Sequence, residues 1–269
     1  MIIDGRALAN ERSLEVLAER KRFGSLSLGI VMATESPVTR SYVSIKKRAA
    51  EVLDIAVHEY RLPDTVTIDE IVREMQKAAV ADHDGIILQL PLPGGIDVEV
   101  AKNAIPLALD VDVLSDSACD AFAQNNFPAI PPVPAAMWYV LKKNNINVAG
   151  KSVVVIGKGR LVGKPAIVLF ERLGGSVVAL EKGDSLDPTK TADIIISGAG
   201  VPALLRPDMI KDGVVIIDGG TSESSGKVVG DADPACAEKA SLFTPVPGGV
   251  GPIAVVEIFA NLIALKARS

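Results

Sequence analysis

One pair of side chains in the first half of this sequence could move a proton. Tyr42 and Lys46 are four residues apart, and on a helix this spacing places a phenol and an amine on one face. Such a pair could hold a substrate ring and exchange a proton with it. A Tyr and a Lys on an ordinary surface helix are the simpler explanation, so the pair needs support from other residues.

Two further polar residues could bind a ligand beside that pair. Gln89 lies near the end of the apolar run 86–90, where an amide must find hydrogen-bond partners or destabilise the fold. The carboxyl ends of parallel strands are where α/β sheets bind ligands, so we favour a functional amide over a structural one. Asp112 offers two acceptor oxygens, which match the amidine edge of a pterin; an acid at a helix end or turn is the alternative.

A glycine-rich turn indicates a phosphate-binding site in the second half. The apolar stretch 152–156 is typical of a buried parallel strand, and Gly157, Gly159 and Gly163 follow it, ahead of a predicted helix. This layout places backbone N–H groups and a helix N-terminus against a phosphate. The third glycine comes one residue late, with Val162 in its usual place, and a tight turn in any α/β domain is the alternative.

A second predicted strand, 177–180, ends in Glu181 about 20 residues further on, where dinucleotide-binding domains recognise the adenosine ribose. A carboxylate there would accept hydrogen bonds from a free ribose diol and repel a 2′-phosphate, which favours NAD. Lys158, Arg160 and Lys182 could instead surround that phosphate, which favours NADP. The residues alone leave this choice open.

The elements that must position these residues alternate between strand and helix. We expect strands at 26–32, 55–61 and 85–90, and helices at 8–21, 41–53, 67 onward and 96–104. Thr67 and Glu70 form a predicted capping box at the start of the third helix. A turn is expected at 35–37. This alternation predicts an open, mostly parallel sheet.

The second half repeats the pattern with strands near 152–156, 177–180, 193–197, 214–218 and 242–244 and helices at 135–144 and 166–173. The polar segment 110–134 lacks periodicity and is expected to cross between domains. The last helix, 253–266, is apolar nearly all round and should pack back on the N-terminal domain. We therefore predict an α/β fold of two domains, 1–117 with 249–269 and a Rossmann-type domain at 118–248, with a cleft between them.

Composition excludes several classes of function. The chain has 269 residues, a net charge of −5 and no basic stripe, so nucleic acid is not an expected partner. Its two cysteines are too few for a disulfide framework, and its two histidines lie near no second plausible ligand, so we expect free thiols and no metal site. No apolar run reaches the ~18 residues that span a bilayer, and no signal-peptide pattern is present; a cytoplasmic protein is expected.

Taken together and in order, the motifs resemble the bifunctional methylenetetrahydrofolate dehydrogenase/cyclohydrolase family over essentially the whole chain. The matching segments are 42–46, 84–93, 110–112, 155–165 and 245–252, with Asp4-Gly5 and 226–231 in addition. The resemblance implies oxidation of 5,10-methylenetetrahydrofolate with a nicotinamide cofactor, then hydrolysis of the methenyl cation to 10-formyltetrahydrofolate. It also implies NADP as the cofactor, with NAD as the alternative, and a homodimer formed through the second domain.

By the same resemblance, each candidate residue receives a role. Lys46 is the catalytic residue that assists proton transfer, and Gln89 binds and tunes it; Tyr42 stacks on the aminobenzoate ring and Asp112 holds the pterin. The remaining implied contacts are Pro247, Gly248 and Gly249 for the folate and Gly157, Lys158, Gly159, Arg160, Val162, Gly163, Glu181 and Lys182 for the cofactor.

The sequence departs from the family pattern beside the site. Val113 stands where glycine is usual, so we expect a different local backbone there, and Ala254 replaces a threonine. A monofunctional dehydrogenase without hydrolysis is therefore one alternative, and a non-catalytic nucleotide sensor is another. Short-chain dehydrogenases also use a Tyr and a Lys at this spacing, but their glycine motif precedes the pair, whereas here it follows.

Overall fold

The computed structural model describes residues 1–34, 36–224 and 227–268, so Glu35 of the predicted turn and Gly226 of the 226–231 motif lie outside the described residues. Contacts divide the chain into two compact units. We call Glu11–Pro132 with Val255–Ser269 the lysine unit, and Met1–Asn10 with Val133–Ala254 the glycine-turn unit. The sequence predicted domain boundaries at 117/118 and 248/249.

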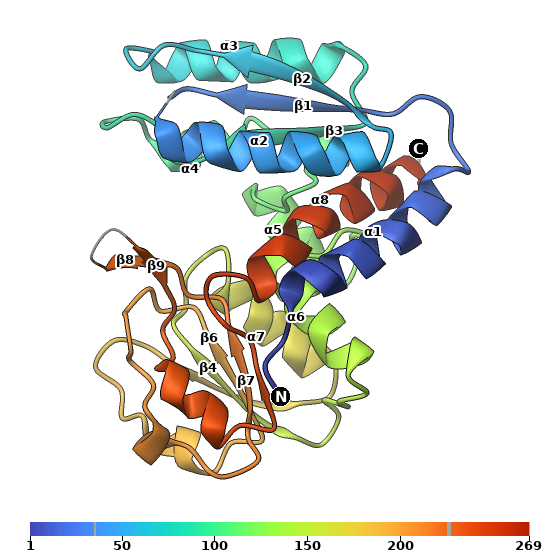
Figure 1. Ribbon diagram of the computed structural model, residues 1–269. Coiled ribbons are helices and arrows are strands. Elements are labelled where there is room, and N and C mark those ends of the chain that lie inside the picture. Colours follow the sequence, from blue (N-terminus) through green and yellow to red (C-terminus); the bar gives the residue numbers. More distant parts are fainter. Residues whose placement is uncertain (35, 225–226, 269) are drawn as a thin grey trace. The chain divides into compact units, whose positions relative to one another are not determined.

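The lysine unit is built on a parallel three-stranded sheet in the order β2-β1-β3. Its strands are β1 (Ser27–Met32), β2 (Ala56–Arg61) and β3 (Gly85–Gln89). Its helices are α2 (Pro37–Val52), α3 (Ile68–Val80), α4 (Val98–Lys102) and α5 (Asp116–Ala123), together with most of α1 (Gly5–Arg20) and α8 (Val250–Lys266). Figure 1 shows α2 and α3 on opposite sides of the strands.

Local sequence explains how α3 begins and which face it buries. The Thr67 hydroxyl accepts a hydrogen bond from the Glu70 amide, and the Glu70 carboxylate accepts one from the Thr67 amide at 2.8 Å, which confirms the predicted capping box. Ile71, Met75 and Ala78 recur at helical spacing and are fully buried against the sheet. The stripe therefore fixes the helix on one face of the strands.

The prediction of an irregular segment at 110–134 was wrong in part, because the segment contains α5. Ser115 caps that helix, and its hydroxyl accepts a hydrogen bond from the Ala118 amide at 3.2 Å. Only Ala118 and Phe122, four residues apart, are buried on α5. Two apolar positions are too few to produce a periodic signal in a short polar helix.

The last helix packs as predicted against the N-terminal elements. The Asn261 amide donates to the backbone oxygens of Val111 and Ile130, both at 2.8 Å. The Glu257 carboxylate accepts from the Arg12 guanidinium on α1 at 2.8 Å, and both groups are largely buried. Residues 255–269 accordingly belong to the lysine unit.

The glycine-turn unit contains a parallel five-stranded sheet in the order β10-β7-β6-β4-β5. Its strands are β4 (Ser152–Ile156), β5 (Ser176–Leu180), β6 (Ile194–Ser197), β7 (Val215–Asp218) and β10 (Leu242–Phe243), and a separate antiparallel hairpin is formed by β8 (Ser222–Ser224) and β9 (Lys227–Val229). Its α-helices are α6 (Pro132–Lys143) and α7 (Gly163–Arg172), and it has short 3₁₀ helices at Asp187–Lys190, Pro207–Met209 and Pro234–Glu238. The lysine unit has one at Leu107–Leu109.

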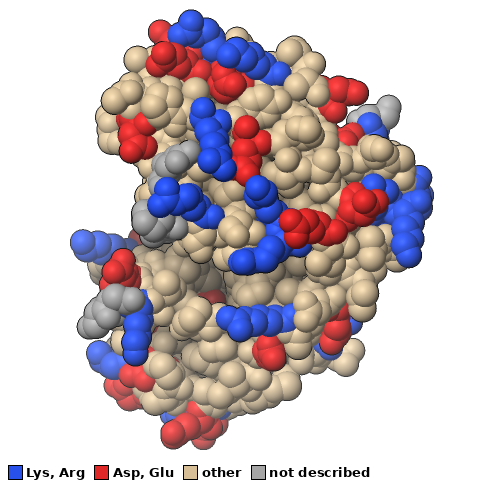
Figure 2. All heavy atoms as spheres, turned by 45° about the horizontal axis from the view of Figure 1, so that its top comes forward, with Lys and Arg blue, Asp and Glu red and all other residues tan. Residues whose placement is uncertain are grey.

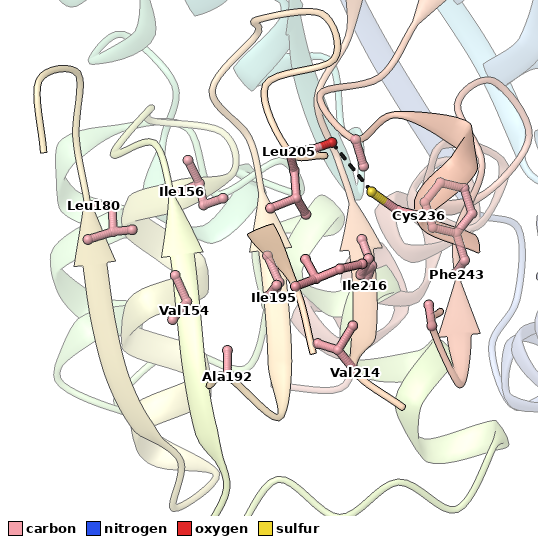
Figure 3. Close-up of a cluster of buried hydrophobic side chains, with 13 residues drawn as sticks. Val154, Ile156, Leu180, Ala192, Ile195, Leu205, Val214, Ile216, Cys236 and Phe243 are labelled. Atoms are coloured by element: carbon pink, nitrogen blue, oxygen red, sulfur yellow. Dashed lines mark hydrogen bonds between the residues drawn. The ribbon is translucent and has the colours of Figure 1, made fainter. Parts of the chain in front are cut away.

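One face of this sheet carries a core of aliphatic side chains. Figure 3 shows Val154, Ile195 and Ile216 projecting from three neighbouring strands into one layer. The Cys236 thiol packs in the same layer and donates to the Leu205 backbone oxygen at 3.4 Å. Aromatic residues make up only 4 % of the chain, and this layer is filled mainly by aliphatic side chains, many of them β-branched, which suit a parallel sheet.

Candidate active site

The structure brings Lys46 and Gln89 into direct contact, although they are 43 residues apart in the sequence. Lys46 lies on α2, and Gln89 is the last residue of β3, at the carboxyl end of the parallel sheet. The Lys46 ammonium Nζ donates to Gln89 Oε1 at 2.7 Å. Gln89 is only 5 % exposed, and its amide is bonded on one side to Lys46 and on the other to the backbone of the next residue.

A second hydrogen bond orients the Gln89 amide. Its Nε2 donates to the Leu90 backbone oxygen at 2.6 Å, which leaves Oε1 turned toward the amine. An amide oxygen can accept from either a charged ammonium or a neutral amine, because it carries no charge itself. The contact therefore positions Lys46 without fixing its protonation state, as a carboxylate partner would.

Asp112 lies near Lys46, in a turn that follows the 3₁₀ helix Leu107–Leu109. The backbone of Asp110 pairs in parallel with Ile86 beside β3, and its fully buried carboxylate accepts from the Ser115 amide at 2.8 Å and from the Ser115 hydroxyl at 2.6 Å. Val113 has φ +52°, in the left-handed region that glycine adopts freely and that a β-branched residue seldom occupies. The buried hydrogen bonds of Asp110 hold the turn despite that side chain.

Burial shifts the protonation of both charged groups toward neutrality. Burial lowers the pKa of the Lys46 ammonium, and the negative charge of Asp112 partly opposes this shift. Burial likewise raises the pKa of the Asp112 carboxyl, with Lys46 opposing the shift and Asp110 adding to it. The lowered pKa makes a neutral Lys46 amine easier to reach than the amine of a lysine in water.

Tyr42 lies one helical turn before Lys46 on α2 and is 47 % exposed. Its ring is therefore open to a ligand from the solvent side. Within the described residues of the helix, Val43 and Ala50 are buried, and at 3.6 residues per turn they lie about 90° around the helix from Tyr42.

In the glycine-turn unit, the turn after β4 is closed so tightly that two of its glycines leave no room for a Cβ. Gly157 has φ +90°, and a Cβ on it would lie 2.7 Å from the Gly198 oxygen; a Cβ on Gly163 would overlap the Gly157 oxygen. Around Gly159 the space is open, since the nearest atom to a Cβ there is 3.8 Å away. Such a turn lets a ligand approach the backbone closely.

The residues of this turn fit a dinucleotide phosphate. Helix α7 begins at Gly163, three residues earlier than predicted, with Val162 as its N-cap. Val162 makes no side-chain capping bond. The Lys164 amide donates to the Gly159 oxygen at 3.0 Å and Pro165 has no N–H, so among the first three helical residues the Gly163 amide is the one that could donate to a ligand. That N–H group and the helix dipole favour an anionic phosphate.

At the end of β5, Lys158 and Glu181 form an ion pair in which the ammonium donates to Oε1 at 2.6 Å. Glu181 and Lys182 are both exposed. The Asp184 carboxylate accepts from the Glu181 amide at 2.8 Å, so a second acid stands at this strand end. Glu181, the acid that favours NAD, is therefore in contact with Lys158, one of the basic residues that favour NADP.

The loop at 245–252, rich in glycine and proline, is bonded to a residue near the N-terminus. The Gly5 amide donates to the Gly248 oxygen at 2.9 Å, and a Cβ on Gly5 would overlap the Gly249 oxygen. The Val246–Pro247 bond is cis, and Gly248 has φ +101° with open space beside it. Asp4-Gly5 is thus a packing element for the 247–249 loop, which the sequence did not indicate.

Sequence analysis missed two buried carboxylates at the carboxyl end of this sheet. Asp218 ends β7 and Asp231 follows β9, and they are 1 % and 0 % exposed. Burial raises the pKa of the Asp218 carboxyl to about 6, and the negative charge of Asp231 adds to that shift. An acid closing an otherwise apolar strand was the one available signal for Asp218.

The described residues were also compared with the patterns of metal sites and membrane-spanning helices. Within 1–34, 36–224 and 227–268, no cluster of three or more His, Cys, Asp or Glu could hold a metal, and no helix is long and apolar enough to cross a membrane. His83 is buried and bonded to Tyr60 at 2.7 Å, which makes it a packing residue. On the face drawn in Figure 2, basic and acidic side chains are interspersed.

Comparison with known proteins identifies both halves of the chain. Residues 3–112 match the model of the tetrahydrofolate dehydrogenase/cyclohydrolase catalytic domain, and residues 131–269 match the model of the NAD(P)-binding domain of the same family. A bifunctional protein FolD from Aquifex aeolicus is 35 % identical over 100 % of this chain and 96 % of its own length.

Solved structures agree with this match. The bifunctional enzyme FolD from Campylobacter jejuni has a TM-score of 0.94 and 30 % identity, covering 100 % of this chain and 99 % of its own. The Trypanosoma brucei methylenetetrahydrofolate dehydrogenase-cyclohydrolase, solved with NADP and an inhibitor, has a TM-score of 0.92 and 29 % identity, with coverages of 100 % and 97 %. The chain therefore belongs to the tetrahydrofolate dehydrogenase/cyclohydrolase family.

Proposed function

We propose that this protein is a bifunctional enzyme that oxidises 5,10-methylenetetrahydrofolate and then hydrolyses the methenyl product to 10-formyltetrahydrofolate. The observation that carries the proposal is the bond between Lys46 and Gln89 in a chain that contains both domains of the family. The lysine unit would bind the folate, and the glycine-turn unit would bind the nucleotide.

The dehydrogenase step needs a nucleotide held beside the folate. When bound, the nicotinamide accepts a hydride from the bridging carbon of the folate. In the glycine-turn unit, the close packing of Gly157 and Gly163 would shape the turn, the open space at Gly159 would leave room for its phosphates, and the Gly163 amide at the start of α7 would donate to them.

The hydrolysis step is assigned to Lys46. The folate cation attracts water without help from a metal, and the water must lose a proton as its oxygen bonds to the carbon. A neutral Lys46 amine can accept that proton, because its lone pair stays available while one N–H is donated to Gln89. The positive charge of the bound substrate would lower the lysine pKa further, in the same direction as burial.

The remaining residues would hold the substrate. Tyr42 would stack on the aminobenzoate ring with its exposed face, and Asp112 would accept two hydrogen bonds from the pterin. The backbone at Pro247, Gly248 and Gly249 is proposed as a further folate contact, on the strength of the family resemblance and of the open space beside Gly248.

We propose NADP as the cofactor. Lys158, Arg160 and Lys182 supply positive charge near the ribose position, and Lys158 already neutralises Glu181 at 2.6 Å. The Trypanosoma brucei relative was solved with NADP. NAD remains the alternative, because a free Glu181 carboxylate would suit a ribose diol.

The decisive experiment measures the two steps separately. Oxidation is followed spectrophotometrically with methylenetetrahydrofolate and NADP or NAD, and hydrolysis is followed with the methenyl substrate and no nucleotide. The Lys46→Gln variant should lose hydrolysis by at least ~10²-fold, since it removes the proton acceptor. Lys47→Gln is the matched control, because Lys47 is the next residue on α2 and pairs instead with Glu59 at 2.6 Å.

Three results would contradict the proposal. Full hydrolysis by Lys46→Gln would remove Lys46 from its role. Oxidation without hydrolysis in the wild type would indicate a monofunctional dehydrogenase, and nucleotide binding without turnover would indicate a sensor. From the family resemblance we also propose a cytoplasmic homodimer, which sedimentation and cell fractionation test.

A further inference from the structure

The buried carboxylate of Asp231 has no role in the chemistry above, yet it makes an unusual set of bonds. Its oxygens accept hydrogen bonds from the Ser197 hydroxyl at 2.7 Å, the Ala199 amide at 2.7 Å, the Gly200 amide at 3.3 Å and the Val201 amide at 2.8 Å. All four donors come from residues 197–201, which we call the β6 loop. Charge-assisted bonds of this kind are strong, so one side chain fixes the whole loop.

The β6 loop lies where a dinucleotide would bind in the glycine-turn unit. In the order β10-β7-β6-β4-β5, strands β4 and β6 are neighbours, and β5 and β7 lie on opposite sides of that pair. Their carboxyl ends therefore form the topological switch point of the sheet, and ligands bind outside such points.

Contacts within the unit place the loop against the glycine turn itself. The Gly198 amide donates to the Ile156 oxygen at 2.9 Å, and a Cβ on Gly198 would lie 2.5 Å from Val162 Cγ1. On its other side the loop is open, because a Cβ on Gly200 would meet nothing within 4 Å. Gly200 also has φ +68°, a conformation that the three amide bonds to Asp231 maintain.

We propose that Asp231 is a positioning residue for the nicotinamide nucleotide: it holds the β6 loop in the shape that forms one wall of the nucleotide site, without touching the nucleotide. The inference rests on the nucleotide use proposed above. A loop with unsatisfied amides would have to be ordered at each binding event, and the carboxylate removes that cost in advance.

The environment of Asp231 decides which variants are informative. Its carboxylate is packed against Gly220, where an added Cβ would overlap it, so larger residues do not fit. Asp231→Asn keeps the shape of the side chain but replaces one acceptor oxygen with an N–H₂ group. That group cannot accept hydrogen bonds, so some of the four bonds to the β6 loop are lost. Ser197→Ala is the milder variant, because it removes one bond of the four.

Asp193 offers a control carboxylate at the other end of β6. It precedes β6, at the amino end of the sheet, where its carboxylate accepts from the Ser152 amide at 3.0 Å and pairs with Lys211 at 2.7 Å. Asp193→Asn therefore makes the same chemical change at the opposite end of β6. A general loss of sheet stability would affect both variants, whereas a role in the nucleotide site would affect only Asp231.

The test uses the full-length protein. The dissociation constant of NADP is measured by calorimetry, the dehydrogenase kcat and the KM for NADP are measured separately, and methenyl hydrolysis is assayed without nucleotide. Asp231→Asn should raise the dissociation constant and KM about tenfold, with hydrolysis unchanged within about twofold. Ser197→Ala should raise both about threefold, and Asp193→Asn should bind as the wild type does.

Unchanged NADP affinity in Asp231→Asn would overturn the inference, as would equal loss of binding and hydrolysis in Asp231→Asn and Asp193→Asn. If Asp231→Asn does not fold, unchanged affinity in Ser197→Ala overturns it instead. A different result would contradict the proposed function: a wild-type protein that binds NADP but does not oxidise the folate. In that case the NADP titration of Asp231→Asn would still test the role of Asp231.

Discussion

Gly163→Ala should destabilise the glycine-turn unit, whereas Gly251→Ala should not. The two glycines occupy the first turns of α7 and α8, and alanine is a better helix former by up to about 1 kcal/mol. At Gly251 an added Cβ meets nothing within 4 Å, so the higher helix propensity of alanine should stabilise this variant without a steric cost.

At Gly163 the same methyl group has no room. It would overlap the Gly157 oxygen and lie 2.7 Å from its carbonyl carbon and 2.9 Å from Lys158 Cα, where ordinary contacts begin at 3.4 Å. The obstacles are backbone atoms and cannot rotate away, so the turn and the helix must separate by more than half an ångström. Overpacking of this kind costs about 1–3 kcal/mol or more, and the two variants should differ by about 2–4 kcal/mol.

Trp138 makes the comparison direct, because it is the single tryptophan of the chain and lies on α6 in the same unit. Urea unfolding followed by its fluorescence gives the free energy of unfolding of each variant. A calorimetric titration with NADP should show weaker binding by Gly163→Ala, since the turn that holds the phosphates is displaced. Equal stability of the two variants would refute the steric reasoning, and wild-type NADP affinity in Gly163→Ala would refute the assignment of the turn.

Two other predictions concern charge. Glu181→Gln should release Lys158 from its ion pair and remove a carboxylate that repels the 2′-phosphate, so the ratio of kcat/KM for NADP over NAD should rise about tenfold. Steady-state rates with both nucleotides measure this ratio. An unchanged ratio would show that this ion pair does not select the cofactor. Asp218 has a folded pKa raised from 3.8 to about 6, so the folded state binds its proton more tightly, and its contribution to stability is fully present below about pH 4 and is lost as the pH rises through 6. The free energy of unfolding of Asp218→Asn should therefore gain on the wild type by up to about 3 kcal/mol between pH 4 and pH 7 in urea titrations, and a constant difference across that range would exclude a buried neutral carboxyl.

Much of the fold was predictable because many of its strands are short apolar runs, and β3, β4, β6 and β7 are buried almost throughout. The prediction for β4 has the same bounds as the structure, and those for β5, β6 and β7 each differ by one residue. The β8–β9 hairpin was not predicted, because its strands are three residues long and mostly exposed. Short elements without a buried face leave no periodic pattern for sequence analysis to find.

The sequence by itself determined which residues could do chemistry, since an amine, an amide and a glycine turn are properties of residue type and local spacing. Tertiary structure decided which atoms of those residues meet: that the Gln89 oxygen faces Lys46, that Lys158 already holds Glu181, and that Asp231 binds the β6 loop. Asp231 and its four donors are separated by about 30 residues, so no local pattern records them. A buried carboxylate finds its partners only when strands distant in sequence become neighbours in the sheet, because burial is what makes those bonds obligatory.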